Sequence, residues 1–183
     1  MIKKIAVIGT GVIGTGWIIR CLAHNFKVTA YDRDPKLKKK IIQEIRRASP
    51  FVKKLFKKKK INLKNFKYVT SLEAALEDAD FIQENATENY KIKTKLMNLI
   101  GKYAKYNAII SSSSSGLLPT KIYSKCKNPA RTMIGHPFNP VYLCPGVEVV
   151  AGKKTKTKFL NKASKFYKSI SCLLYTSDAA DDW

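Results

Sequence analysis

Three glycines and an aspartate near the N-terminus have the types and spacing needed to hold a dinucleotide. Gly9, Gly11 and Gly14 follow an apolar run at residues 3–8 and open a second apolar stretch, and Asp32 ends the next one. In this pattern the first glycine permits a tight turn, the second lets the backbone approach a pyrophosphate, and the third lets a helix pack closely on a strand. The start of that helix supplies free N–H groups and a partial positive charge for the phosphates.

Asp32 is also the residue that would choose between two cofactors. A carboxylate can accept hydrogen bonds from the hydroxyls of an adenosine ribose and would repel a 2′-phosphate, so Asp32 favours NAD over NADP. Its neighbour Arg33 weakens this preference, because arginine accommodates a 2′-phosphate. The predicted NAD site contains the three glycines, Asp32 and the helix-start residues Val12 and Ile13.

A histidine and a glutamate farther along the chain could supply acid–base chemistry. His136 is followed by Pro137 and Pro140, which predict a stiff turn here and not a helix. Twelve positions after His136, Glu148 lies in an otherwise apolar run at residues 147–150, where an unpaired buried carboxylate would be costly. If the chain folds back, Glu148 can hold one imidazole nitrogen and leave the other free as a base. The spacing alone equally allows a turn histidine and an edge-strand glutamate without a catalytic role.

Alternating apolar patterns predict the elements that must position these residues. Strands are expected at residues 3–8, 28–31, 66–69, 80–84, 108–110, 132–134 and 147–150. Helices are expected at residues 12–23, 72–76, 90–105, 120–123 and 159–170. Strands that alternate with helices are typical of the α/β class with a doubly wound, mostly parallel sheet. The five serines at residues 111–115 would lie at the carboxyl edge of that sheet, where such folds bind ligands.

Two of the helices carry more specific expectations. Apolar residues recur at helical spacing from Ile41 to Leu55, and Pro50 predicts either two helices there or one helix with a kink. For the helix at residues 90–105 the expected apolar face is Ile92, Leu96, Leu99, Ile100 and Tyr103.

Taken together, these motifs resemble the 3-hydroxyacyl-CoA dehydrogenase family. The resemblance rests on the glycine turn with Asp32, on residues 81–84, on the serines with Gly116-Leu117-Leu118-Pro119, and on residues 135–150. It extends as far as Ile170 and implies a Rossmann-type NAD-binding domain at residues 1–171. The residues at 115–119 and 135–143 are most similar to members that oxidise L-carnitine. Acyl-CoA members more often have a second aromatic residue where this chain has Pro137.

The resemblance also implies roles for individual residues. His136 matches the catalytic base, Glu148 the acid that orients it, and Ser115 the serine that hydrogen-bonds the substrate hydroxyl. Further family positions that contact the nucleotide or the substrate are matched by Glu88, Lys93 and Asn139. The implied reaction moves the proton of the C3 hydroxyl to His136 and a hydride from C3 to NAD, which turns L-carnitine into 3-dehydrocarnitine. Gly146 stands where similar carnitine enzymes have leucine, and this is expected to loosen the approach to Glu148.

Two other functions stay open. A short-chain 3-hydroxyacyl-CoA dehydrogenase is favoured by charge, because the lysines at residues 53–60 could attract CoA phosphates. The other open function is a non-catalytic module that binds a nucleotide or polyanion. It is suggested by the net charge of +22, which results from 35 Lys and Arg against 13 Asp and Glu. Nucleic-acid surfaces usually mix arginine and aromatic residues. The chain has few arginines, so we interpret residues 53–60 as a solvated helix face and expect no nucleic-acid partner.

The remaining composition limits compartment and partners. Cys21, Cys126, Cys144 and Cys172 show no disulfide or metal-ligand spacing, so no metal site is predicted. The first apolar run has only the length of a strand, and no apolar run approaches the length of a membrane span. We therefore expect a cytoplasmic protein with a small-molecule substrate and no membrane partner. By the resemblance, the full-length form is expected to be a homodimer.

The last twelve residues, 172–183, differ in composition from the rest of the chain. They contain three aspartates and no lysine or arginine. They resemble the translation of a sequencing adapter, so we interpret them as a non-native tail, with a natural acidic tail as the alternative, and expect them to pack poorly. The family continues with a C-terminal helical domain that supplies an active-site asparagine and the dimer interface. We therefore expect this domain to be missing here and the chain to be a truncated NAD-binding part.

Overall fold

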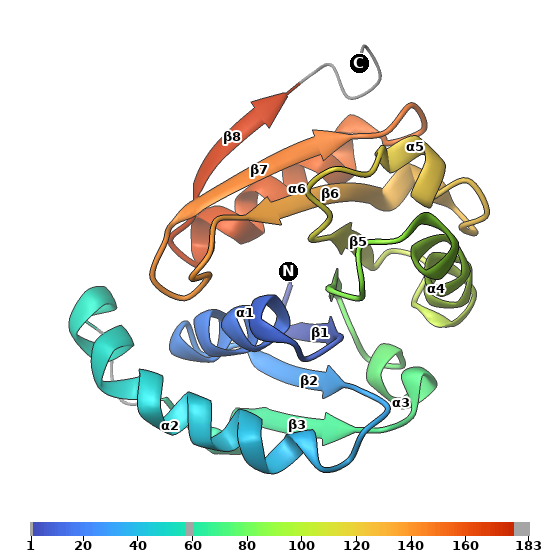
Figure 1. The fold of residues 1–183 in the computed structure, drawn as a ribbon. Coiled ribbons are helices and arrows are strands. Elements are labelled where there is room, and N and C mark those ends of the chain that lie inside the picture. The colour runs from blue at the N-terminus through green and yellow to red at the C-terminus, as the bar shows by residue number, and fades with distance from the viewer. Residues whose placement is uncertain (1, 58–60, 178–183) are drawn as a thin grey trace.

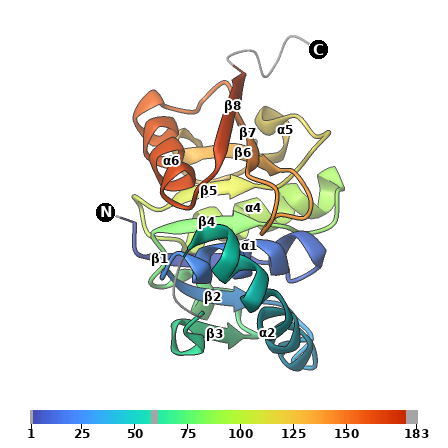
Figure 2. The same cartoon turned by 90° about the vertical axis from the view of Figure 1, so that its left-hand side faces the viewer.

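In a computed structural model, residues 2–57 and 61–177 are described, and they form an eight-stranded sheet covered by helices on both faces (Figures 1 and 2). The strand order is β3-β2-β1-β4-β5-β6-β7-β8, and every neighbouring pair is parallel except β6 and β7. The strands are β1 (Lys4–Ile8), β2 (Lys27–Tyr31), β3 (Phe66–Val69), β4 (Phe81–Glu84), β5 (Ile109–Ser112), β6 (Thr132–Pro137), β7 (Gly146–Ala151) and β8 (Leu173–Ser177). This order, which runs outward from β1 in both directions, confirms the doubly wound α/β class.

The helices divide between the two faces of the sheet. They are α1 (Val12–Ala23), α2 (Leu37–Phe56), α3 (Leu72–Leu76), α4 (Tyr90–Tyr103), α5 (Pro119–Ile122) and α6 (Thr157–Ser169), with single 3₁₀ turns at Leu63–Asn65 and Pro129–Arg131. Helices α1, α2 and α6 contribute to one apolar cluster, and α3, α4 and α5 to the other. None of these described helices is both long and apolar enough to cross a bilayer.

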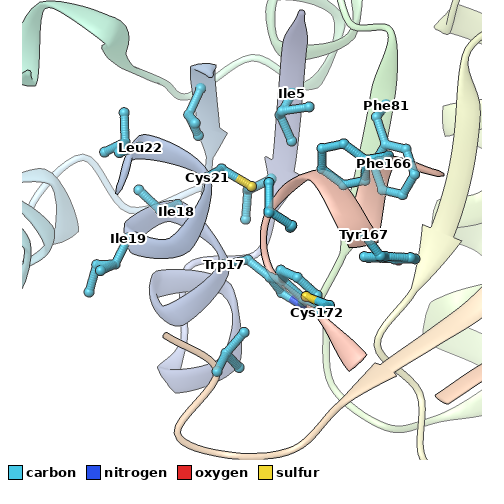
Figure 3. Close-up of a cluster of buried hydrophobic side chains, with 14 of the residues drawn as sticks. Ile5, Trp17, Ile18, Ile19, Cys21, Leu22, Phe81, Phe166, Tyr167 and Cys172 are labelled. Atoms are coloured by element: carbon cyan, nitrogen blue, oxygen red, sulfur yellow. The ribbon is translucent and has the colours of Figure 1, made fainter. Parts of the chain in front are cut away.

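Strand β1 shows why the central strands read as unbroken apolar runs. Ile5 and Val7 belong to the cluster under α1 and α6, whereas Ala6 and Ile8 belong to the cluster on the opposite face. Because successive side chains of a strand point to opposite faces, a strand covered on both sides must be apolar at every position. In the first cluster, Trp17 of α1 packs against Tyr167 of α6 (Figure 3).

Helix α2 is one curved helix that continues through Pro50 (Figure 1). Pro50 is exposed, so its ring and its missing N–H lie on the solvent side of the helix. The apolar stripe is buried from Ile41 to Val52 and ends at Leu55, which is exposed. The expectation of one helix with a bend is therefore the correct one of the two alternatives.

The face that helix α4 turns to the sheet overlaps only partly with the expected one, since Ile100 is buried and Leu96 and Leu99 pack partly against the cluster. Its buried residues are Lys93, Met97, Ile100 and Gly101, whereas Ile92 is 47% exposed. A lysine stands on the buried face because a carboxylate of β4 lies beneath it, and a pattern of apolar residues could not reveal that pair.

The segment around His136 also differs from its prediction. His136 was expected in a stiff turn, but it lies in strand β6, which extends to Pro137. The chain then reverses through residues 138–145, and β7 returns antiparallel with Glu148 directly opposite His136. Pro137 is tolerated at the end of a strand because the N–H that it lacks is not needed there.

Buried Arg20 joins α1 to that reversal. Its Nε donates to the carbonyl of Val141 at 2.7 Å, its Nη2 to Cys144 at 2.8 Å, and its Nη1 to Ile170 at 3.0 Å. A buried guanidinium needs acceptors for all its donors. Helix α1, the 138–145 connection and the end of α6 are therefore held by one side chain.

The expectation that residues 172–183 pack poorly is wrong for residues 172–177. Strand β8 pairs parallel with β7, and Cys172 is buried in the same cluster as α1 and α6. Leu174 packs partly against that cluster while Leu173 is 61% exposed, so the strand has a core face and a solvent face. Residues 178–183 lie outside the described part of the chain. The domain boundary at residue 171 and the adapter origin remain predictions.

The two leucines of β8 provide a matched test of this packing. Leu174→Ala removes partly buried apolar surface and should lower the free energy of unfolding by about 1 kcal/mol, less than a fully buried leucine would cost. Leu173→Ala should change it by less than about 0.5 kcal/mol, because that side chain faces solvent. Urea unfolding of both variants would measure the difference. Equal effects would show that β8 does not dock as described.

Candidate active site and nucleotide-binding edge

The glycine turn after β1 is closed by two contacts that exclude side chains. Gly9 has φ +86°, and its N–H donates to the carbonyl of Tyr31 at 2.9 Å. A Cβ on Gly14 would lie 1.9 Å from the carbonyl oxygen of Gly9. Gly9 is therefore required by its backbone conformation, and Gly14 by the close packing of α1 on the turn.

Gly11 has a different reason to be glycine. A Cβ built there meets no atom within 4 Å, so nothing in the described protein fills the space beside it. Gly11 is also the residue before α1, and no side chain caps this helix end. The first N–H groups of the helix, near exposed Val12 and half-buried Ile13, are thus open to an anion. These features fit the pyrophosphate of NAD.

Asp32 is fixed at the carboxyl end of β2 by the turn that it faces. Its Oδ2 accepts hydrogen bonds from the N–H of Thr10 at 2.9 Å and from the Thr10 hydroxyl at 2.8 Å. Its Oδ1 accepts from the N–H of Arg33 at 2.8 Å. A carboxylate has further lone pairs for ribose hydroxyls. Thr10 was missed in the sequence, where a hydroxyl residue between two glycines was its only signal.

A cavity of about 670 Å³ lies between the glycine turn and the connection that follows β6. Its lining comes from the turn, helix α1, the first half of α2 and residues 139–142, and it includes Gly11, Asp32 and Asn139. The structure therefore brings the predicted substrate-side Asn139 and three predicted cofactor residues, Gly11, Val12 and Asp32, to one hollow.

Glu88 holds the serine segment that follows β5. Its Oε1 accepts hydrogen bonds from the Ser114 hydroxyl, from the N–H of Ser115 at 3.0 Å and from the N–H of Gly116 at 3.2 Å. Partial burial acts to raise the pKa of the Glu88 carboxyl, but these hydrogen bonds and nearby Lys93 outweigh it, so the pKa lies below its ordinary value of 4.5. Ser115 itself is exposed, which suits contact with a substrate.

Lys93 lies behind Glu88 in a buried ion pair. Its Nζ donates to both carboxylate oxygens of Glu84, at 2.9 and 3.0 Å, and to the carbonyl of Ala86 at 2.9 Å. The carboxylate of Glu88 is 3.5 Å from the same Nζ. Ser112 completes the cluster through a hydrogen bond to Glu84. Since Lys93 is only 1% exposed, the structure places it where it supports Glu88 from below.

His136 and Glu148 face each other across β6 and β7. Their Nδ1 and Oε2 atoms are 3.7 Å apart, a distance for an ion pair with the imidazolium and too long for a hydrogen bond. The side chains are 29% and 45% exposed, so the expectation of a buried glutamate is wrong. Nε2 of His136 makes no hydrogen bond to the described residues. It is the nitrogen left for a substrate.

Ser115 follows strand β5, and His136 lies near the end of strand β6. Because these two neighbouring strands are parallel, both residues lie at the same edge of the sheet. No direct hydrogen bond joins them within the described residues. A substrate hydroxyl between the two side chains would be the link.

The ring of Phe138 packs against Gly146. A Cβ at Gly146 would lie 2.4 Å from the Phe138 ring. The ring thus occupies the place where a side chain would begin, and the expectation of a looser approach to Glu148 is wrong.

Comparison with known proteins agrees with this fold. Residues 4–172 match the family described as 3-hydroxyacyl-CoA dehydrogenase, NAD binding domain. The doubly wound fold, the glycine turn that leads into an uncapped helix N-terminus, and Asp32 together define an NAD-binding protein. The chain belongs to this 3-hydroxyacyl-CoA dehydrogenase family.

Similar proteins fall into two groups. L-carnitine dehydrogenase of Oceanobacillus iheyensis is 44% identical over 168 residues, which are 92% of this chain and 55% of that protein. L-carnitine dehydrogenase of Pseudomonas aeruginosa is 40% identical over 169 residues, 92% of this chain and 53% of that protein. The chain spans about half the length of these curated relatives.

The second group consists of solved structures. 3-Hydroxybutyryl-CoA dehydrogenase from Escherichia coli K12 superposes with a TM-score of 0.89 at 25% identity, covering 96% of this chain and 38% of that one. (S)-3-Hydroxybutyryl-CoA dehydrogenase from Ralstonia eutropha gives the same TM-score and identity, covering 96% and 63%.

The glycine turn generates the first prediction for this site. Gly11→Val should abolish NAD binding, because the new side chain fills the space beside the helix N-terminus. It should leave the urea midpoint unchanged, since the backbone at Gly11 is extended (φ −62°, ψ −166°) and its Cβ meets nothing. Gly14→Ala is the contrast, because it adds less volume yet should cost about 2 kcal/mol or more through its clash with Gly9. Calorimetric titration with NAD would measure the binding by each variant, and urea unfolding would measure the stability of each. Undiminished binding by Gly11→Val would show that the cofactor does not lie there.

The lowered pKa of Glu88 predicts a pH-dependent contribution to stability. A carboxyl whose folded pKa is depressed stabilises the fold above its unfolded pKa, and this contribution is lost as the pH falls through the folded pKa. The difference in unfolding free energy between the parent and Glu88→Gln should therefore be present at neutral pH and vanish in acid. Urea unfolding over a pH series would measure it, with exposed Glu77→Gln as the control. A difference that persists unchanged in acid would contradict the assignment.

Proposed function

We propose that this chain is the NAD-binding part of an enzyme that oxidises the 3-hydroxyl of L-carnitine to 3-dehydrocarnitine. The observation that carries the proposal is the identity of up to 44% with relatives named L-carnitine dehydrogenase, over nearly all of this chain. The facing His136 and Glu148 at the nucleotide edge supply the chemistry such an oxidation needs.

In the proposed site, Gly11 and Asp32 hold the cofactor, with Glu88 and buried Lys93 behind it. When bound, NAD supplies the acceptor for the hydride that leaves C3 of the substrate. Ser115 hydrogen-bonds the substrate hydroxyl from a segment fixed by Glu88.

His136 removes the proton of that hydroxyl through Nε2. Glu148, 3.7 Å from Nδ1, stabilises the imidazolium that results. Asn139 contacts the substrate from the wall of the shared cavity. Because the chain spans only about half the length of its curated relatives, we propose that turnover needs the further residues that those relatives possess.

A short-chain 3-hydroxyacyl-CoA dehydrogenase is the second candidate. It is supported by the TM-score of 0.89 with two 3-hydroxybutyryl-CoA dehydrogenases. Sequence identity favours carnitine, at 44% against 25%. Of the basic segment 53–60, Lys53 and Lys54 are exposed on α2, as a solvated helix face requires, and residues 58–60 lie outside the described part of the chain.

Cytoplasmic location and a homodimer of the full-length form are also proposed. The location is supported by the four cysteines, all of which are free thiols in the structure. The homodimer rests on the family resemblance.

Activity in a completed protein tests the reaction. A chimera would join residues 1–170 to the part of the Oceanobacillus iheyensis L-carnitine dehydrogenase beyond the matched region. It should oxidise L-carnitine faster than 3-hydroxybutyryl-CoA, with NADH formation followed by absorbance. His136→Gln should lower kcat by about 10²- to 10⁴-fold with NAD affinity retained, the usual value of general-base assistance.

The controls separate the chemistry from folding. His24→Gln should leave kcat unchanged, because His24 hydrogen-bonds at the far end of α1. The 183-residue chain alone should bind NAD and turn over neither substrate. A chimera that prefers the acyl-CoA substrate would favour the second candidate, and full activity of His136→Gln would refute the mechanism.

A further inference from the structure

A fully buried polar network lies beneath the strand that carries His136. The Tyr167 hydroxyl donates to Oε1 of Gln83 at 2.7 Å and shares a hydrogen bond of 2.8 Å with the Ser111 hydroxyl. Tyr167, Gln83 and Ser111 are each at most 1% exposed. Figure 3 shows Tyr167 reaching from α6 toward the sheet beside Trp17. No role was predicted for Gln83 or Tyr167, and Ser111 was expected only as one of the serines at the carboxyl edge of the sheet.

Gln83 bridges two backbone segments that the sheet itself leaves apart. The pairing of β5 with β6 ends at Ser112 and Ile134. Just beyond it, the amide nitrogen of Gln83 donates to the carbonyl of Gly135 at 3.2 Å and to the hydroxyl of Ser113 at 2.8 Å. Gly135 directly precedes His136, and Ser113 lies two residues before Ser115. One side chain thus joins the two segments that carry the candidate catalytic residues.

Tyr167 determines which way the Gln83 amide faces. Because the Tyr167 hydroxyl donates to Oε1, the NH₂ group must point at Gly135 and Ser113. Ser113 is itself fully bonded, since it accepts from Trp17 Nε1 at 3.0 Å and donates to Asn85 Oδ1 at 2.7 Å. Buried networks in which every member is satisfied rigidify the segments that they join.

The packing at Gly135 shows how closely this network supports the strand. A Cβ there would lie 2.0 Å from the Tyr167 hydroxyl and 2.5 Å from the Ser111 hydroxyl. The residue before His136 therefore rests directly on the network and must be glycine.

We infer that Gln83, oriented by Tyr167, is a positioning residue that sets the placement of His136 relative to Ser115. The functional meaning of that placement rests on the proposed dehydrogenase reaction, but the geometry can be tested without turnover. Helix α6 acquires a role in the site through this contact, although none of the predicted site residues lies in it.

The chain is well suited to a spectroscopic test because it contains only two histidines. In the uniformly isotope-labelled 183-residue protein, Gln83→Met and Tyr167→Phe should each shift or split the ring signals of His136 and the amide signal of Ser115. His24→Gln assigns the two ring signals, and the His24 signals should stay in place. Gln83→Met keeps the length and burial of the side chain, and Tyr167→Phe removes only the hydroxyl.

Tyr123→Phe is the matched control. Tyr123 is also buried, and its hydroxyl donates to the carbonyl of Met133 in the same strand, but from the other face of the sheet. It should lower the urea midpoint as Tyr167→Phe does, yet leave the His136 and Ser115 signals unchanged. Unchanged signals in both Gln83→Met and Tyr167→Phe, or equal shifts in Tyr123→Phe, would overturn the inference. Loss of carnitine oxidation in the chimera experiment would leave it standing, so the two failures can be told apart.

Discussion

The parallel pairing of β2, β1, β4, β5 and β6 is the constraint on which the site depends. Parallel strands end at one edge of a sheet, so residues that follow β1, β2, β4 and β5 must meet there with the end of β6. The glycine turn, Asp32, Glu88, Ser115 and His136 are gathered by this geometry from more than a hundred residues of chain. The helices on both faces exclude water from the strands, so ligands are expected at the carboxyl edge of the sheet.

The antiparallel return of β7 adds the one contribution that a purely parallel sheet could not supply. An antiparallel strand begins beside the end of its neighbour. The first residues of β7 therefore bring Glu148 to the edge of the sheet where His136 lies. The connection between them is short and is fixed by Arg20 from α1. Helix α1 thus begins at the glycine turn and, through Arg20 near its other end, holds the connection between the strands of His136 and Glu148.

Local patterns were sufficient for most of the fold, because helix and strand periodicities depend on neighbouring residues. Helix α1 and strand β3 have the predicted bounds, and the glycine turn with Asp32 was recognised from spacing alone. The direction of β7, the buried face of α4 and the Gln83–Tyr167 contact depend on partners distant in sequence. Lys93 was singled out only by the family resemblance, and its burial could not be predicted without knowing that the carboxylate of Glu84 lies beneath it. Strand β8 was missed because the composition of residues 172–183 suggested a poorly packed tail, whereas its pairing with β7 is not visible in the sequence.

The register of β6 against β7 has an evolutionary consequence. A shift of one residue in an antiparallel pair turns every side chain of one strand to the opposite face. An insertion or deletion in residues 138–145 that slipped β7 by one position would aim Glu148 away from His136 while leaving the sheet paired. Length variation in this connection is therefore compatible with a working pair only where the change is absorbed in the loop or in a bulge. We therefore expect related chains to vary less in the length of this connection than in the sequence of its exposed residues.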